Sequence, residues 1–210
     1  MITKIVIIGA SGFGREVLWT IKDCNKQAKK YEILGFIDDD ESLWGKVIDE
    51  YLVLGGLEWF STESKENIEC VIGISDSKTR RKIVEKLTKQ KIIFSTVIHP
   101  SVIYSKSVSI GQGTIIQAGS ILTIDIHIGD HVHVNIDSTV GHDTIIGDFV
   151  TINPGVNING NTTIGNDTFV GTGTVMNQKL KIGNNSIIGA GTVLLKDVPA
   201  FSMYVGVPGK

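Results

Sequence analysis

The sequence lacks a strong charge of either sign and any long hydrophobic run. Its 20 basic and 22 acidic side chains give a net charge of -2, so there is no basic field for nucleic acid or an anionic membrane. No stretch of about 18 apolar residues could span a membrane. The apolar run near the N-terminus breaks at Gly9, which argues against a signal peptide. These absences predict a cytoplasmic protein.

Cysteine is scarce as well. Cys24 and Cys70 belong to no metal or redox motif, so we expect both thiols to be buried and structural. No cysteine or serine has the flanking residues of a nucleophile, which argues against a covalent acyl-enzyme. The alternation His131-x-His133 has no carboxylate or cysteine partner in its pattern, so we predict no metal site.

What the sequence does have is a six-residue repeat from Ile98 to Val198. Stepping by six from Ile98 meets 17 positions, of which 15 are Ile, Val or Leu and the others are Tyr104 and Met176. Four places further on in each hexad, every residue is Val, Ile, Leu, Thr or Ser. A fixed short period is typical of stacked coils, in which each unit buries its apolar face against its neighbours.

A period of six excludes a helix, because it does not keep one helical face apolar. We interpret each hexad as a short strand plus a turn, with three hexads forming a triangular coil. Gly or Asn often follows the aliphatic position, and we expect those residues to adopt the positive φ of tight corners. A β-solenoid without catalytic function is the alternative reading of the repeat.

The residues before the repeat predict a small α/β domain. Apolar runs indicate buried parallel strands, and apolar residues at helical spacing lie between them. Strands that alternate with helices imply a parallel sheet with right-handed crossovers. We predict a Rossmann-like domain over residues 1–97 and a β-helix over 98–210, whose tail covers the last coil. The expected strands are Lys4–Gly9, Tyr31–Ile37 and Glu69–Ile74, with a short segment at Leu52–Gly55; the expected helices are Arg15–Lys29, Leu57–Phe60 and Asp76–Gln90.

A glycine-rich loop, Gly9–Gly14, joins the first expected strand to the first helix. Glycines there let backbone N–H groups approach a phosphate at the positive end of the helix. Asp38, which closes the second strand, could accept hydrogen bonds from a ribose or a base. The spacing G-x-x-G-x-G departs from the dinucleotide-binding fingerprint, so a tight turn with a solvated acidic loop remains the alternative.

One histidine stands out as an acid–base candidate. His142 follows the corner residue Gly141 and precedes Asp143, which could favour one tautomer and strengthen the base. A solvated, non-catalytic histidine is the alternative reading. His127, His131 and His133 occupy outward strand positions, where we expect solvated imidazoles.

Both halves together resemble one family, the sugar O- and N-acetyltransferases of the sialic acid O-acetyltransferase type, which includes nucleotide 4-amino-sugar N-acetyltransferases. The resemblance covers the whole chain. It implies that the β-helix is left-handed and that the protein is a homotrimer with its active site between subunits. The motifs that carry it are GASGFGREV (Gly9–Val17), GFIDDD (Gly35–Asp40), GISDSKTRRKI (Gly73–Ile83), GHDTIIGDFVTINPGV (Gly141–Val156) and VGVPGK (Val205–Lys210).

The resemblance also implies roles for individual residues. His142 looks like the general base, Asp143 like its acidic neighbour and Asn135 like the residue near the reacting amine. Positions that hold the nucleotide sugar in the family are occupied here by Gly9, Ala10, Ser11, Asp38, Asp39 and Gly73. Positions along the acetyl-CoA cleft are occupied by Thr151, Thr172 and Ala190.

The expected reaction is acetyl transfer from acetyl-CoA to the amino group of a UDP-, dTDP- or GDP-linked 4-amino sugar, without a metal. Such sugars serve bacterial surface glycan or O-antigen synthesis. A histidine base serves an amine or a hydroxyl, so O-acetylation of a sugar such as sialic acid is an alternative. A non-catalytic scaffold that senses a nucleotide is a further alternative.

Overall fold

The N-terminal half is a four-stranded parallel sheet between two helices. The structure is a computed structural model that describes residues 2–61 and 68–210. Within the sheet the strand order is β2-β1-β5-β6, formed by β1 (Thr3–Ile8), β2 (Tyr31–Ile37), β5 (Ile68–Ile72) and β6 (Ile93–Phe94). Ile5 and Ile7 of β1 pack in a core with helix α1 (Gly12–Gln27), whereas Val6 and Ile8 pack with α2 (Ser77–Thr88). Alternate residues therefore serve opposite layers, as the unbroken apolar strand predicts.

Local sequence explains where the helices lie. Val17, Leu18 and Ile21 form the buried face of α1, and the Asp76 side chain caps α2 by accepting a hydrogen bond from the Thr79 N–H at 2.8 Å. The predicted strands and both long helices are confirmed, with shifts of a few residues at their ends. Cys24 and Cys70 are buried, as expected.

The connection between β2 and β5 is more irregular than predicted. Of the expected segment Leu52–Gly55, only Leu52 lies in a strand, β4 (Tyr51–Leu52), which forms an antiparallel hairpin with β3 (Val47–Ile48), and Val53 forms an isolated bridge to Phe36. The expected helix at Leu57–Phe60 is a short 3-10 helix, η2 (Leu57–Ser61), and a second one, η1, spans Glu41–Leu43. Leu57 and Phe60 are buried in the sheet core, so packing determines this turn despite its weak hydrogen bonding.

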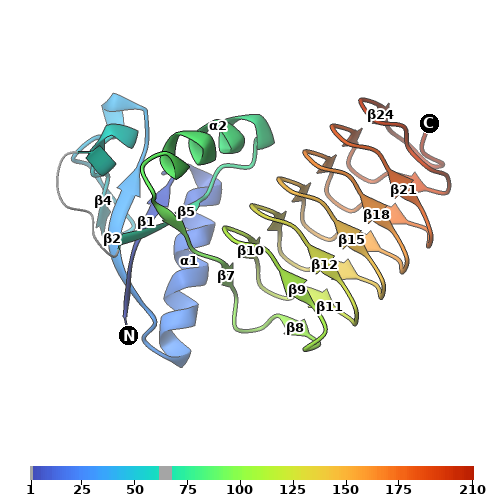
Figure 1. Ribbon diagram of the computed structural model, residues 1–210, viewed down its shortest axis with the longest axis horizontal. Coiled ribbons are helices and arrows are strands. Elements are labelled where there is room, and N and C mark those ends of the chain that lie inside the picture. Colours follow the sequence, from blue (N-terminus) through green and yellow to red (C-terminus); the bar gives the residue numbers. More distant parts are fainter. Residues whose placement is uncertain (1, 62–67) are drawn as a thin grey trace.

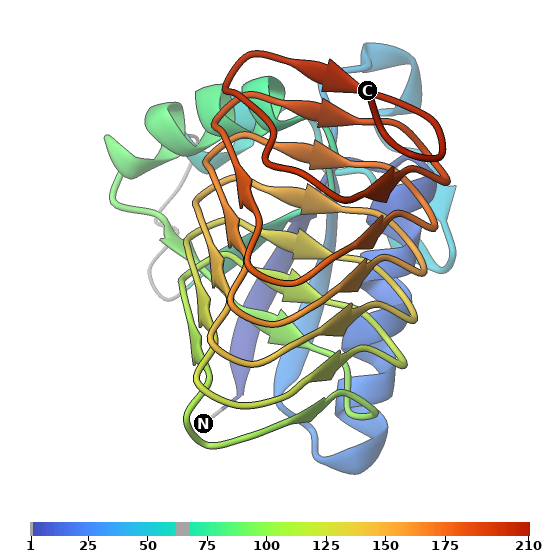
Figure 2. The same ribbon diagram turned by 90° about the vertical axis from the view of Figure 1, so that its right-hand side faces the viewer.

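The C-terminal half is a three-sided prism whose coils stack in one direction (Figure 1). Each predicted aliphatic position is the second residue of a two-residue strand, and all interstrand pairs are parallel. Viewed along the stack, every coil is triangular (Figure 2). The three faces, named here by their first strands, contain the following strands. The β7 face has β7 (Val97–Ile98), β10 (Ile115–Ile116), β13 (His133–Val134), β16 (Thr151–Ile152), β19 (Phe169–Val170), β22 (Ile187–Ile188) and β24 (Met203–Tyr204); the β8 face has β8 (Ile103–Tyr104), β11 (Ile121–Leu122), β14 (Thr139–Val140), β17 (Asn157–Ile158), β20 (Val175–Met176) and β23 (Val193–Leu194); the β9 face has β9 (Ser109–Ile110), β12 (His127–Ile128), β15 (Ile145–Ile146), β18 (Thr163–Ile164) and β21 (Lys181–Ile182).

The inside of the prism is a ladder of aliphatic side chains, almost all of them excluded from water. Small hydroxyl residues fill the inner corners and bond to the next coil. The Thr114 hydroxyl, for example, donates to the Gly129 carbonyl at 2.9 Å, and the Thr168 hydroxyl donates to the Gly183 carbonyl at 3.0 Å. This explains why Thr and Ser are accepted beside Val at the fourth position of the repeat: most of these hydroxyls are buried but hydrogen-bonded, with Thr144 an exception among the described residues.

The predicted reason for the corner glycines was wrong. Glycines that directly follow the aliphatic position, such as Gly147 and Gly171, do not adopt positive φ. Positive φ occurs two residues later, at every sixth residue from Gly113 to Gly191, and includes Asp143 and Phe149. At Gly171 a Cβ atom would lie 2.5 Å from the Ala190 nitrogen of the next coil. Close stacking of backbone on backbone therefore selects glycine at this position.

The tail closes the prism, as predicted. β24 adds to the β7 face, and the chain then loops back so that the Gly209 N–H donates to the Val193 carbonyl at 2.9 Å. At the other end, Val97 already pairs with Ile115 of the prism. The division between residues 97 and 98 stays a prediction.

The two halves are joined by a buried arginine. Arg80 of α2 is fully buried in the seam, the contact surface between the two halves. On the N-terminal side of the seam it donates to the carbonyls of Ile74 and Ser75, at 2.8 and 3.1 Å. Across the seam its acceptors all belong to the prism: the His131 carbonyl (3.0 Å), the Phe149 carbonyl (2.8 Å), the Thr151 hydroxyl (3.1 Å) and His133 Nδ1 (3.3 Å). Burial lowers the pKa of Arg80 to about 10, so it remains charged at neutral pH.

The expectation that His131 and His133 are solvated was wrong. His131 is 2% exposed and His133 is fully buried, because the N-terminal domain covers their face of the prism. His131 stacks on Phe149 with ring centroids 5.0 Å apart. The Arg81 guanidinium lies over the Phe149 ring, 4.0 Å from its centroid. Arg81 also forms an ion pair with Asp167 at 2.6 Å. His127, in contrast, is exposed, as expected.

The glycine positions allow a test of the repeat. Gly171→Ala should lower the free energy of unfolding by about 1–3 kcal/mol, because its methyl group would overlap the next coil. Gly173→Asn should change it by less than about 1 kcal/mol, because Gly173 has positive φ and open space, and Asn161 and Asn185 occupy equivalent corners. Urea denaturation of both variants measures the difference. Equal losses would contradict the stacking explanation.

The seam histidines predict a loss of stability in mild acid. Burial lowers the pKa of His131 to about 4 and holds that of His133 well below its ordinary value. Between about pH 7 and pH 4 the unfolded chain binds protons at these two histidines that the folded chain does not bind. The free energy of unfolding should therefore fall as the pH is lowered over this range, by up to about 1.4 kcal/mol per pH unit for each histidine. Urea midpoints at several pH values should fall less steeply for His131→Phe than for the wild type. His127→Gln, an exposed control, should keep the wild-type slope.

Candidate active site

The glycine loop lies at the point where the chain reverses direction across the sheet. From β1 the chain moves outward to β2 and then returns to β5 on the other side, and ligands of open α/β sheets bind at such a point. Gly9 has a φ of +98°, and a Cβ on Gly14 would lie 1.9 Å from the Gly9 carbonyl. A Cβ on Gly73 would lie 2.7 Å from the Gly14 Cα. These three glycines let the loop, α1 and the end of β5 pack backbone against backbone.

The acidic triplet that follows β2 fixes the shape of this region. One Asp38 oxygen accepts a hydrogen bond from the Ala10 N–H at 2.8 Å, and the other accepts from the Asp40 N–H at 3.0 Å. Asp39 accepts from the Leu57 N–H at 3.3 Å. Ser11 is exposed at the start of α1, and its side chain makes no capping hydrogen bond. The structure thus brings the six predicted nucleotide-sugar residues to one end of the sheet, although Asp38 also has a clear structural role.

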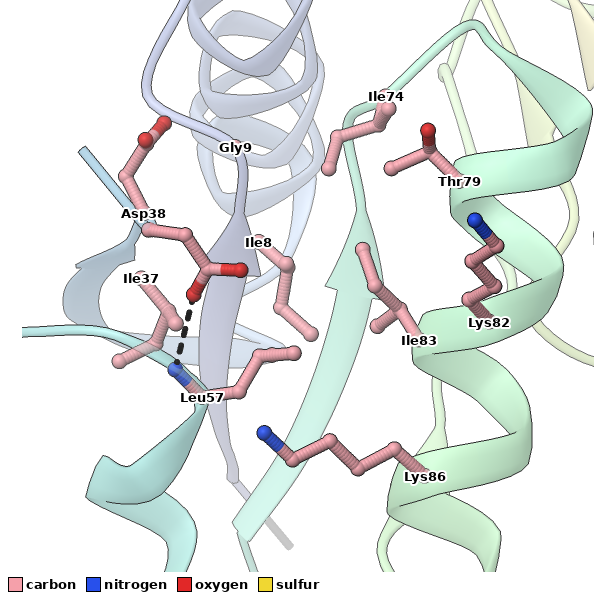
Figure 3. Close-up of a pocket in the computed structure, with 11 residues that line it drawn as sticks. Ile8, Gly9, Ile37, Asp38, Leu57, Ile74, Thr79, Lys82, Ile83 and Lys86 are labelled. Atoms are coloured by element: carbon pink, nitrogen blue, oxygen red, sulfur yellow. Dashed lines mark hydrogen bonds between the residues drawn. The ribbon is translucent and has the colours of Figure 1, made fainter.

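A cavity of about 330 Å³ opens beside this loop (Figure 3). Its walls are apolar, with Ile8, Ile37 and Leu57 on one side and Ile74 and Ile83 on the other. Lys82 and Lys86 of α2 extend toward it, opposite the carboxylates of the triplet.

Sequence reasoning missed both lysines of this cavity. Their i, i+4 spacing on the face of α2 that also carries Ile83 was the available signal. Lys86 pairs with Glu58 at 2.9 Å, whereas the Lys82 amine has no hydrogen-bond or ion-pair partner within residues 2–61 and 68–210.

His142 and Asp143 form a pair on the edge of the prism between the β8 and β9 faces. His142 Nδ1 and Asp143 Oδ2 are 2.7 Å apart, and both side chains are about half exposed, at 53% and 54%. Asp143 has a φ of +57°, which turns its carboxylate back toward the preceding ring. A carboxylate on Nδ1 leaves Nε2 as the nitrogen that can accept a proton from a substrate.

The remaining predicted residues lie elsewhere on the prism. Asn135, Thr172 and Ala190 share the edge between the β7 and β8 faces; Asn135 is 5% exposed, and its Oδ1 has no hydrogen-bond partner among the described residues. Thr151 lies in the seam, where its hydroxyl donates to the Ser75 carbonyl at 2.9 Å and accepts from Arg80. Its hydroxyl is therefore already engaged by the N-terminal domain.

One chain alone does not bring these groups together. The N-terminal domain rests on the β7 face: α1 packs on Val97 and Ile115, and Arg80 reaches the edge between the β9 and β7 faces. In a three-sided prism, the edge between the β8 and β9 faces lies opposite the β7 face. His142 therefore lies on the far side of the prism from the cavity beside the glycine loop.

The part of the chain that the structure describes contains neither a candidate membrane-spanning helix nor a candidate metal site. No helix there is long and apolar enough to cross a membrane. No three His, Cys, Asp or Glu side chains in the same residues gather closely enough to hold a metal ion.

Comparison with known families matches both halves of the chain. The family described as the PglD N-terminal domain matches residues 4–87, and the bacterial transferase hexapeptide family, with six repeats, matches residues 161–196. A curated relative, UDP-N-acetylbacillosamine N-acetyltransferase of Bacillus subtilis (strain 168), is 37% identical over 73 residues. That match covers 30% of this chain and 34% of the relative, about a third of its length.

Three solved structures are similar over almost the whole chain. WeeI from Acinetobacter baumannii AYE is 35% identical, with a TM-score of 0.89 and 99% of both chains covered. The acetyltransferase domain of PglB from Neisseria gonorrhoeae FA1090, in complex with acetyl coenzyme A, is 28% identical, with a TM-score of 0.91 and 100% and 99% covered. A perosamine N-acetyltransferase from Caulobacter crescentus, in which one histidine is replaced by asparagine and which is in complex with CoA and GDP-perosamine, is 26% identical, with a TM-score of 0.91. The match covers 100% of this chain and 97% of that one.

Proposed function

This chain belongs to the PglD-type hexapeptide-repeat nucleotide-sugar N-acetyltransferases, which use acetyl-CoA, and we propose that His142 is the base of a direct transfer to the amine of a nucleotide-linked 4-amino sugar. The hydrogen-bonded pair of His142 and Asp143, half exposed on a rigid edge, carries this proposal. A role in bacterial surface glycan or O-antigen synthesis, which the family resemblance implies, is part of this proposal. Acetyl-CoA and nucleotide sugars are cytoplasmic metabolites, so the reaction would take place in the cytoplasm.

The proposed reaction needs one proton acceptor and two well-placed substrates. Asp143 holds the Nδ1–H of His142, so that Nε2 takes the proton of the amine as its nitrogen attacks the thioester carbonyl. Backbone N–H groups stabilise the oxyanion; as the intermediate collapses to the amide, the C–S bond breaks and the departing CoA thiolate takes the proton from Nε2 to leave as the thiol. Alignment of the two bound substrates supplies much of the acceleration.

The cavity beside the glycine loop is the proposed nucleotide site. The loop presents backbone N–H groups at the start of α1, where a diphosphate is favoured. Lys82 adds a positive charge that no described side chain neutralises. The apolar walls suit the flat face of a base. The Caulobacter relative, which holds a GDP-linked amino sugar, supports a ligand of this class.

We also propose a cyclic trimer whose site is shared between neighbouring chains. The β8 face exposes Ile103, Ile121 and Val175, which would be covered in an assembly. One edge of this face carries His142, and its other edge carries Asn135, Thr172 and Ala190. Packing around a threefold axis can bring the His142 edge of one chain next to the edge of its neighbour that carries Asn135, Thr172 and Ala190. This would unite the base with the proposed acetyl-CoA residues.

Substitution of the base gives the first test. His142→Ala should lower kcat about 100-fold or more, measured as CoA release from acetyl-CoA with a panel of nucleotide 4-amino sugars. Asp143→Asn should lower kcat by a smaller factor, because it keeps the geometry but weakens the hold on the ring. Full activity of His142→Ala would refute the proposed base. Turnover only with hydroxyl acceptors would favour the O-acetyltransferase alternative.

Mixed oligomers test whether the site is shared. Lys82→Glu should abolish acceptor binding at ordinary substrate concentrations, whereas Lys89→Glu, a charge reversal at the far end of α2, should not. Co-expression of His142→Ala chains with Lys82→Glu chains, purified through two different tags, should restore about a third of wild-type activity, because every trimer that carries both tags has one of its three sites with an intact cavity and an intact base. No recovery would place both groups of each site in the same chain.

A further inference from the structure

One corner residue departs from the rule that the rest of the prism follows. The second residue after each strand from β7 to β23 is a corner position, and only one of its 17 occupants is glycine, Gly160. Gly160 does not have positive φ, so its backbone conformation does not require glycine. The full set is Pro100, Lys106, Gln112, Ala118, Ile124, Asp130, Ile136, His142, Asp148, Pro154, Gly160, Asn166, Thr172, Gln178, Asn184, Ala190 and Lys196.

The reason for this glycine lies one coil away. Gly160 follows His142 by 18 residues, so the two occupy the same edge in successive coils. A Cβ on Gly160 would lie 2.6 Å from Nε2, 2.7 Å from Cε1 and 2.9 Å from Cδ2 of His142. The three atoms that such a side chain would meet first all belong to the imidazole. The ring therefore rests directly on the Gly160 backbone.

We propose that Gly160 is a positioning residue for His142. Its backbone, which carries no side chain, supports the imidazole and keeps it against Asp143 with Nε2 free for the substrate. The inference rests on the proposed function of His142 as the base. The ring is held at two places: Asp143 binds Nδ1 at 2.7 Å, and Gly160 supports the opposite side of the ring. Because the ring is half exposed, these two contacts decide where it lies.

A methyl group on Gly160 should disturb the ring and leave the coil intact. The obstructed atoms are the end of a half-exposed side chain, which can rotate away at low cost. Ala118 and Ala190 occupy the same position at other edges, so the corner accepts alanine. Alanine also keeps the backbone N–H, so any loss of activity arises from the added Cβ.

The test compares Gly160→Ala with Gln178→Ala, a matched control in the next coil of the same edge. Gly160→Ala should lower kcat about 10-fold or more, with both KM values within about threefold and an unchanged Tm. Nitrogen NMR of the His142 ring should show the Nδ1–H tautomer in the wild type and in Gln178→Ala. In Gly160→Ala it should show the tautomer mixture of free histidine. Wild-type kcat and an unchanged tautomer would overturn the inference.

A second background separates the ring from the backbone. In His142→Ala there is no imidazole to displace, so adding Gly160→Ala should change neither Tm nor residual activity. A fall in Tm in that background would mean that the coil itself requires glycine and would overturn the inference. The NMR readout does not depend on turnover. Full activity of His142→Ala would therefore refute the base, while the ring signal would still decide whether Gly160 holds the imidazole.

Discussion

The arrangement of the molecule depends on the buried guanidinium of Arg80. Removal of an arginine from water is costly, and no carboxylate is bonded to it here. The cost is offset because carbonyls from both halves converge on its five N–H groups, and this requires both halves to be in place. Ile74 lines the cavity, so the contact that docks the domain also shapes the proposed nucleotide site.

This docking has a consequence for catalysis. The domain is fixed on the β7 face, and the His142 edge faces away from it, so a rigid single chain cannot carry its own cavity to its own base. A flexible linker would have allowed such a movement, but β6 and β7 are separated by only two residues, Ser95 and Thr96. The proposal of a shared site between copies rests on this rigidity more than on any single residue.

The repeat could be predicted almost residue by residue, because its period is local and each coil contacts only its neighbours. The role of Gly171 could not, because the nearest obstacle is 19 residues away, in the next coil. His131 and His133 looked outward by strand alternation, and they are outward; a second domain covers them, which no pattern within the repeat reveals. Lys82 and Lys86 had a visible spacing, but only the fold shows which face of α2 borders the cavity. The contact between His142 and Asp143 could be proposed from the sequence, whereas its geometry depends on the corner backbone.

The edges of the prism differ in the hydrogen bonds that their corner residues form. Between the β9 and β7 faces, Asp130, Asp148 and Asn184 each accept a hydrogen bond from a backbone N–H one coil away, so that edge forms a closed ladder. At the equivalent corner position of the His142 edge, Ile124, His142 and Gly160 follow one another, and no side chain of theirs accepts such a bond among the described residues. The bonds between coils on that edge involve other positions, such as the Asp125 N–H donating to the Ser107 hydroxyl. A side chain that is not committed to bonding the next coil can act on a substrate. A strict repeat thus provides rigidity, and corner side chains that are not bonded to the next coil leave room for the proposed base.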